Sequence, residues 1–201
     1  MASPIFVLPK RKMNRCALPK APVSRMFLPR LRNVLHQNVR HQVRHHHLVT
    51  KCEVGLLYAT ATGSTREVAE AIKECFPMQG VVSDPIDVSE GSFTPETLRR
   101  FSDGLIIGAP TWATARDDMR TGTCMDELLW RLRMDYPSDF LEGIPFAIFG
   151  CGDAKLWPEN YAEAMDEIYT TLCAAGGTPH GHWRPQPGEE YLFEKSKSFR
   201  S

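Results

Sequence analysis

The stretch that decides the fold is Tyr58-Ala59-Thr60-Ala61-Thr62-Gly63-Ser64-Thr65. An apolar run precedes it at residues 54–57, and apolar residues at helical spacing follow it at residues 66–76. This pattern predicts a strand, a tight loop rich in hydroxyl groups, and the start of a helix. Backbone N–H groups at a helix N-terminus bind anions, and a glycine lets the backbone approach them closely. Residues 60–65, the hydroxyl loop, are therefore a candidate phosphate site; the alternative is a capped turn without a ligand.

The hydroxyl loop differs from the two commonest nucleotide-binding loops. A nucleoside-triphosphate loop needs Gly-x-x-x-x-Gly-Lys-Ser/Thr, and a dinucleotide loop needs Gly-x-Gly-x-x-Gly. Neither spacing occurs at residues 58–65. The loop would therefore hold a phosphate with hydroxyl and backbone N–H donors, and without a lysine.

Strand and helix patterns alternate along the rest of the domain. Further strands are predicted at residues 81–88, 103–110, 144–150 and 178–183. Helices are predicted at residues 66–75 and 95–100, around Leu128 to Leu132, and at residues 160–175. This alternation predicts a doubly wound α/β fold, with a parallel sheet covered by helices on both faces. In such sheets ligands bind beyond the carboxyl ends of the strands.

Three loops leave those carboxyl ends, at residues 60–65, 110–116 and 151–160. The second carries Trp112 and the third carries Trp157. A large aromatic residue just past a buried strand suggests a binding surface, although either Trp alone is more often a loop-packing residue. Two of them beside a phosphate site can stack on both faces of a flat ring system.

Four motifs in this order resemble those of the flavodoxin family, in its long-chain form. They are Thr-x-Thr-Gly-x-Thr at residues 60–65, Pro110-Thr111-Trp112, Phe149-Gly150-Cys151-Gly152-Asp153, and Gly181-His182-Trp183 followed by Tyr191-x-Phe193-x-x-Ser196-Lys197. The resemblance covers residue 53 to about residue 198. It implies a flavodoxin-like sheet with strand order 2-1-3-4-5 and non-covalently held FMN.

The resemblance also implies a role for each loop. The hydroxyl loop would hold the FMN phosphate, Trp112 would cover one face of the flavin, and Trp157 would cover the other, where the family usually has Tyr. The full set of candidate cofactor-binding residues is Thr60, Ala61, Thr62, Gly63, Ser64, Thr65, Pro110, Thr111, Trp112, Ala113, Thr114, Cys151, Gly152, Asp153, Trp157 and Asn160.

The function implied is that of a low-potential one-electron carrier, used in place of ferredoxin, for example in photosynthetic electron transport. Its partners would resemble ferredoxin–NADP reductase and photosystem subunits, docked transiently by electrostatics onto a monomer. Residues 51–201 hold fourteen basic and twenty-four acidic residues, a formal charge of −10 that penalises an anionic reduced flavin. The alternatives are an FMN-dependent quinone reductase of flavodoxin-like fold and a truncated, non-redox interaction module.

The sequence indicates no enzyme chemistry and no metal site. No Ser-His-Asp spacing and no convincing acid–base pair is present. The six Cys residues include no Cys-x-x-Cys pair, as a zinc site or an iron–sulfur cluster would show. Four acidic residues near Trp112 are instead predicted to steer partners: Asp117, Asp118, Asp126 and Glu127.

Residues 1–50 form a basic leader that differs from the domain. They contain ten Lys or Arg, five His, five Pro and no acidic residue. This composition predicts a disordered organelle transit peptide, cleaved before Glu53. The resemblance favours a plastid over a mitochondrion. A nucleic-acid-binding arm is less favoured because aromatic interleaving is missing, and no stretch is long enough for membrane insertion.

The C-terminus departs from the long-chain pattern. Long-chain flavodoxins continue into the rest of the last strand and a C-terminal helix, whereas this sequence stops at Ser201. We therefore expect the usual C-terminal helix to be missing, either through a truncated gene model or in the protein itself.

Overall fold

The computed structural model describes Phe6–Val7, residues 53–76, 81–90, 93–113 and 120–181, and Ser196 and Ser198. Its elements are β1 (Phe6–Val7), β2 (Gly55–Tyr58), α2 (Ser64–Glu74), β3 (Ile86–Asp87), α3 (Pro95–Leu98), β4 (Leu105–Pro110), α4 (Cys124–Met134), β5 (Pro145–Cys151), α5 (Ala164–Ala174) and β6 (Thr178–Pro179). In the described part of the chain, no helix is long and apolar enough to cross a bilayer.

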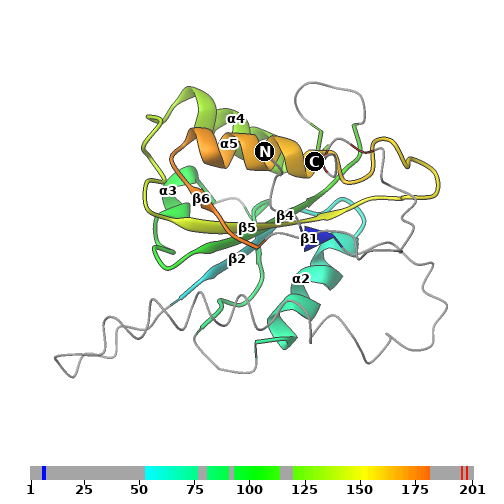
Figure 1. Ribbon diagram of the computed structural model, residues 1–201. Helices are drawn as coiled ribbons and strands as arrows, with labels where there is room; N and C mark the ends of the chain where they lie inside the picture. Colours follow the sequence, from blue (N-terminus) through cyan, green and yellow to red (C-terminus); the bar gives the residue numbers. More distant parts are fainter. Residues whose placement is uncertain are drawn as a thin grey trace.

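The strands form one parallel sheet. Strand β2 lies between β3 and β4, β5 pairs with β4, and β6 pairs with β5. Numbered from β2, this is the predicted order 2-1-3-4-5. Helices α3, α4 and α5 cover one face of the sheet, and α2 covers the other (Figure 1). The prediction of a doubly wound α/β fold is therefore confirmed.

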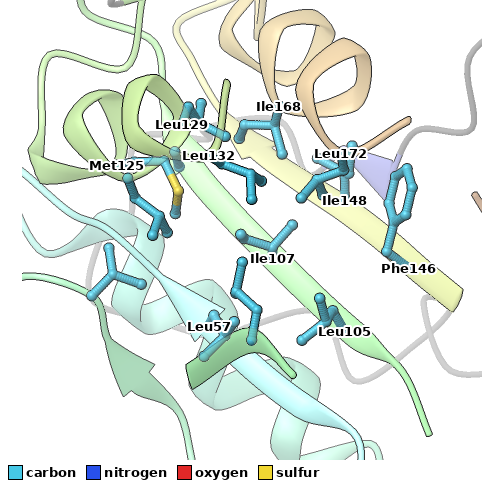
Figure 2. Close-up of a cluster of buried hydrophobic side chains, with 14 of the residues drawn as sticks. Leu57, Leu105, Ile107, Met125, Leu129, Leu132, Phe146, Ile148, Ile168 and Leu172 are labelled. Carbon is cyan, nitrogen blue, oxygen red and sulfur yellow. The ribbon is translucent and has the colours of Figure 1, made fainter. Parts of the chain in front are cut away.

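The core has two parts because successive strand residues point to opposite faces of the sheet. Leu57, Ile107 and Ile148 belong to the larger cluster, which packs under α4 and α5 (Figure 2). Leu56 and Ile106 belong to a smaller cluster that packs against α2. Apolar residues on both faces explain why these strands read as continuous apolar runs.

Several predicted elements are shorter than expected. The predicted second strand, residues 81–88, is reduced to β3 and an isolated bridge between Val82 and Val54. Pro85 lies between them and cannot donate to a ladder. The predicted helix at residues 160–175 begins only at Ala164, because Ala162 has a φ of 53°. The last predicted strand, residues 178–183, is reduced to β6: His180 and Gly181 are not part of the strand, and residues 182–183 lie outside the described residues.

Part of the basic leader joins the sheet. Phe6 and Val7 pair in parallel with Phe149 and Gly150, on the edge of β5 that also carries β6. The predicted disorder of residues 1–50 therefore does not hold for these two residues, since the outer edge of β5 offers unpaired backbone groups to a further strand. The other residues of the leader, and the region of the expected C-terminal truncation, lie outside the described residues.

Candidate functional site

The parallel register brings the three predicted loops to one end of the sheet. Tyr58, the last residue of β2, pairs with Gly108, and Pro110 at the end of β4 pairs with Cys151 at the end of β5. One residue further on, the Thr111 N–H donates to the carbonyl of Cys151 at 2.9 Å. The hydroxyl loop, the Trp112 loop (residues 111–121) and the Trp157 loop (residues 152–163) therefore begin side by side.

The hydroxyl loop has the backbone of an anion site. Gly63 is the N-cap of α2, in the left-handed region at φ 89°, and no side chain of the described residues caps the helix there. The Gly63 N–H donates to Thr60 Oγ1 at 2.9 Å, which tightens the loop. Ala61 and Thr62 are exposed, so the loop is open to solvent. The uncapped first turn of α2 therefore offers N–H groups to an incoming anion.

Thr65 is a donor without a partner within this loop. Its side chain is fully buried, and its Oγ1 has no hydrogen-bond partner among the described residues. A buried hydroxyl left unsatisfied costs about 1–3 kcal/mol, so such groups are rare in native structures. The hydroxyl lies in the first turn of α2, where the helix dipole favours a negative charge. This combination indicates a site built for an anionic ligand.

The Trp112 loop holds its aromatic side chain toward solvent. The N–H groups of Trp112 and Ala113 both donate to the carbonyl of Arg120, at 3.1 and 3.2 Å. The indole is 54% exposed. Gly122, at φ 61°, lies behind it, where a Cβ would come within 2.9 Å of Trp112 Cβ. Thr114 lies outside the described residues.

The end of the Trp112 loop is capped by an acidic residue. Asp126 is buried and accepts from the Thr121 and Gly122 N–H groups at 3.0 and 2.8 Å. The prediction that Asp126 steers partners is therefore wrong, because its carboxylate is used to close the loop onto α4. Glu127 is exposed as expected, whereas Asp117 and Asp118 lie outside the described residues.

The Trp157 loop is a compact turn. The Asp153 carboxylate accepts from the N–H groups of Lys155 and Leu156, each at 3.0 Å, and its carbonyl accepts from the Trp157 N–H at 2.9 Å. Asn160 closes the turn by donating to the Trp157 carbonyl at 3.3 Å. Trp157 is 56% exposed. Both predicted aromatic residues are thus large exposed side chains at the carboxyl end of the sheet.

Comparison with known proteins agrees with this arrangement. The sequence model of the flavodoxin family matches residues 56–188. The chain belongs to the flavodoxin family. It is 32% identical over 146 residues to a flavodoxin of Picosynechococcus sp., covering 72% of this chain and 78% of the relative. It is 31% identical over 149 residues to a flavodoxin of Synechocystis sp., covering 74% and 79%.

The flavodoxin fold is also found by comparison of structures. A Fusobacterium nucleatum flavodoxin variant bound to flavin mononucleotide superimposes with a TM-score of 0.57 and 21% sequence identity, covering 72% of this chain and 75% of that one. At this identity the likeness concerns the fold. Flavodoxins act as electron-transfer proteins.

One charged cluster of this flavodoxin-family domain was not anticipated from the sequence. The Arg66 guanidinium donates from Nε to the Tyr58 hydroxyl at 2.8 Å and lies 3.5 Å from the Asp87 carboxylate. Arg66 follows Thr65 directly, so a cation does lie beside the hydroxyl loop, but a carboxylate neutralises it. The sequence does contain a sign of this cluster: Arg66 is a basic residue in the first turn of a helix, where acidic residues are preferred.

Burial affects two titratable groups near the loops. Burial raises the pKa of the Tyr161 phenol well above its usual range, and burial likewise raises the pKa of the Cys124 thiol. Both groups therefore stay protonated at neutral pH, whereas a thiol or a phenol that acts as a nucleophile or base needs a lowered pKa. Among the residues that the structure describes, no group of three His, Cys, Asp or Glu could hold a metal ion.

Proposed function

We propose that the domain binds FMN without a covalent bond and carries single electrons at low potential between protein partners. The observation that carries this proposal is the buried Thr65 hydroxyl, which has no partner among the described residues, in a helix N-terminus at the same end of the sheet as two exposed Trp residues. When bound, FMN supplies the capacity to take up and release one electron at a time. The chain's own residues hold it, orient it and exclude water.

Each loop has a distinct part in this proposal. Thr60, Thr62, Ser64 and Thr65 would donate to the phosphate through hydroxyl and backbone groups, and Gly63 would let them approach. Trp112 and Trp157 would cover the two faces of the flavin ring. The remaining contacts would come from backbone and side chains that border these groups, namely Ala61, Pro110, Thr111, Ala113, Thr114, Cys151, Gly152, Asp153 and Asn160.

The charge of the domain supports a low potential. Residues 51–201 carry a formal charge of −10, and the cation beside the hydroxyl loop, Arg66, is paired with Asp87. Little positive charge therefore offsets a phosphate and an added electron. An aromatic cover that excludes water raises the free-energy cost of adding an electron further, because the local dielectric constant falls.

We place this carrier in photosynthetic electron transport, in place of ferredoxin, with partners like ferredoxin–NADP reductase and photosystem subunits. The resemblance to long-chain flavodoxins and the acidic surface support this role. Exposed Glu127 and the exposed Leu156 beside Trp157 are suited to a transient contact with a basic partner that has an apolar centre. We propose that such a partner docks transiently onto a monomer.

The first prediction concerns the choice of cofactor. The purified domain should bind FMN with one-to-one stoichiometry and should bind FAD at least about tenfold more weakly, because the hydroxyl loop provides for a single terminal phosphate. Flavin fluorescence titrations with FMN, FAD and riboflavin measure this. A protein that stays colourless after exposure to saturating FMN would support the non-redox interaction module. Rapid steady-state reduction of a quinone by a nicotinamide would support the quinone reductase.

The second prediction concerns the basic leader, which we propose directs the protein to a plastid and is then removed. Its ten basic residues would offset the acidic charge of the domain, and its removal would also withdraw β1 from the edge of β5. Residues 1–52 fused to a fluorescent reporter should therefore carry it into plastids, and the mature N-terminus should lie close before Glu53. Signal in mitochondria would favour the alternative organelle. Diffuse cytosolic signal with Met1 retained would overturn the proposal.

A further inference from the structure

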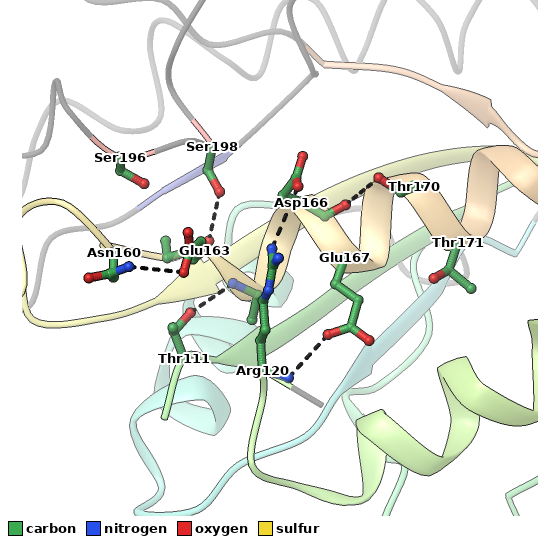
Figure 3. A network of polar contacts seen from close by, with 12 residues as sticks. Thr111, Arg120, Asn160, Glu163, Asp166, Glu167, Thr170, Thr171, Ser196 and Ser198 are labelled. Carbon is green, nitrogen blue, oxygen red and sulfur yellow. Dashed lines mark hydrogen bonds and ion pairs between the residues drawn. The ribbon is translucent and has the colours of Figure 1, made fainter. Parts of the chain in front are cut away.

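The N-terminal end of α5 contacts the Trp112 loop and follows directly on the Trp157 loop. The Ala164 N–H donates to Thr111 Oγ1 at 3.1 Å, at the start of the Trp112 loop. Asn160 Nδ2 donates to the Glu163 carboxylate at 3.1 Å, at the end of the Trp157 loop. Ser196 and Ser198 donate to the carbonyls of Tyr161 and Ala162 from the other side. Figure 3 shows Thr111, Asn160, Glu163 and Ser198 close to the N-terminal end of α5.

Glu167, one turn further along α5, is the buried centre of this network. It is only 5% exposed. Its Oε2 accepts from the backbone N–H of Arg120 at 3.1 Å. Its Oε1 accepts from both terminal nitrogens of Arg133, on α4, at 3.1 Å each. The two oxygens of one carboxylate are thus divided between α4 and the end of the Trp112 loop.

The contact between Glu167 and Arg120 is linked to Trp112 through the Arg120 backbone. The carbonyl of Arg120 accepts from the N–H groups of Trp112 and Ala113. The Arg120 guanidinium is itself held by Asp166, at 3.6 Å, one residue before Glu167. Arg120 is therefore fixed to α5 through its backbone and its side chain, and the Trp112 backbone is fixed to Arg120.

We infer that Glu167 is a positioning residue, which fixes the backbone of Trp112 and Ala113 relative to α5 by holding the Arg120 backbone. This inference rests on the proposed function for its meaning, because the position of Trp112 matters only if the indole covers a flavin. A carboxylate serves here because both neighbours are donors: one oxygen meets a guanidinium and the other a backbone N–H. An amide cannot accept at both places.

The test compares a variant of the carboxylate residue with a variant of its partner on α4. Glu167→Gln replaces one acceptor oxygen with an amide donor, so the side chain can no longer accept from both Arg120 and Arg133. Arg133→Met leaves the Glu167 carboxylate in place and removes the contacts of the guanidinium with Glu167 and Thr171. In the apoprotein, Glu167→Gln should speed hydrogen exchange at the Trp112 and Ala113 amides by about tenfold or more, since their acceptor residue is released. Arg133→Met should change these amides by less than about threefold, and the Gly63 amide should be unaffected in both variants.

Flavin binding gives the second readout. With FMN, Glu167→Gln should weaken binding by about tenfold and shift the potential of the second one-electron reduction, while Arg133→Met should leave both nearly unchanged. Unchanged protection at Trp112 in Glu167→Gln would overturn the inference, and so would equal loss of protection in both variants. If Glu167→Gln fails to fold, the double variant Glu167→Gln with Arg133→Met, which removes the buried pair together, replaces it. The exchange experiment uses the apoprotein, so it tests the inference even if the wild-type protein binds no FMN. Failure to bind FMN would overturn the proposed function and not the inferred contact.

Discussion

Replacing Thr65 with Val should weaken FMN binding by about 10- to 100-fold, because a hydrogen bond to a charged phosphate contributes about 1.5–3 kcal/mol. The same substitution should leave the apoprotein as stable as before, or more stable. In the apoprotein the buried Thr65 hydroxyl has no partner among the described residues, so a methyl group in its place removes an unsatisfied donor and keeps the volume. Opposite effects on binding and stability are the signature of a residue that serves a ligand.

Thr171→Val is the matched control. Thr171, on α5, is also buried, but its hydroxyl oxygen accepts from Arg133 at 3.4 Å. This variant should lower the free energy of unfolding by about 1 kcal/mol and leave FMN affinity within about twofold. Chemical denaturation of both apoproteins and fluorescence titration with FMN measure the four quantities. Unchanged FMN affinity in Thr65→Val would show that the hydroxyl loop does not hold the phosphate.

Replacing Trp157 with Ala should raise the potential of the second one-electron reduction by about 60 mV, which corresponds to a tenfold change in an equilibrium constant. The indole is 56% exposed at the end of its loop, where it would cover one flavin face. Its removal admits water, which stabilises an anionic product and so makes the reduction easier. FMN affinity of the oxidised protein should fall by about 5- to 100-fold through lost stacking.

Two further variants make the Trp157 result specific. Trp157→Tyr restores the residue usual in the family and should return most of the potential and affinity. Trp130→Ala removes another half-exposed indole, on α4, and should change neither quantity. A potential that is unchanged or lower in Trp157→Ala would show that this residue does not cover the ring.

Much of the fold could be predicted because its signals are local. The apolar runs of β2, β4 and β5 are buried on both faces, and such runs are visible without the structure. The hydroxyl loop likewise carries its own signal in residues 60–65. The early break before α5 could not be foreseen, because the left-handed conformation of Ala162 is unusual for a residue with a Cβ.

The site was predicted less completely because several of its contacts join distant segments. Glu167 and Arg120 are separated by 47 positions, and no local pattern links them. The prediction that Asp126 steers partners failed for a different reason. Its position three residues after Thr123 is a helix N-terminal signature, and this predicts a capping role as readily as an acidic docking surface. Capping should be tested first whenever an acid lies in the first turn of a helix.

The most direct test of one-electron transfer is a potentiometric titration of the FMN-loaded domain, followed by visible absorbance. We predict two separate one-electron steps, with the second well below the potential of FMN in solution, because the acidic domain disfavours an anionic flavin. A single two-electron step near the potential of FMN in solution would contradict the proposed carrier.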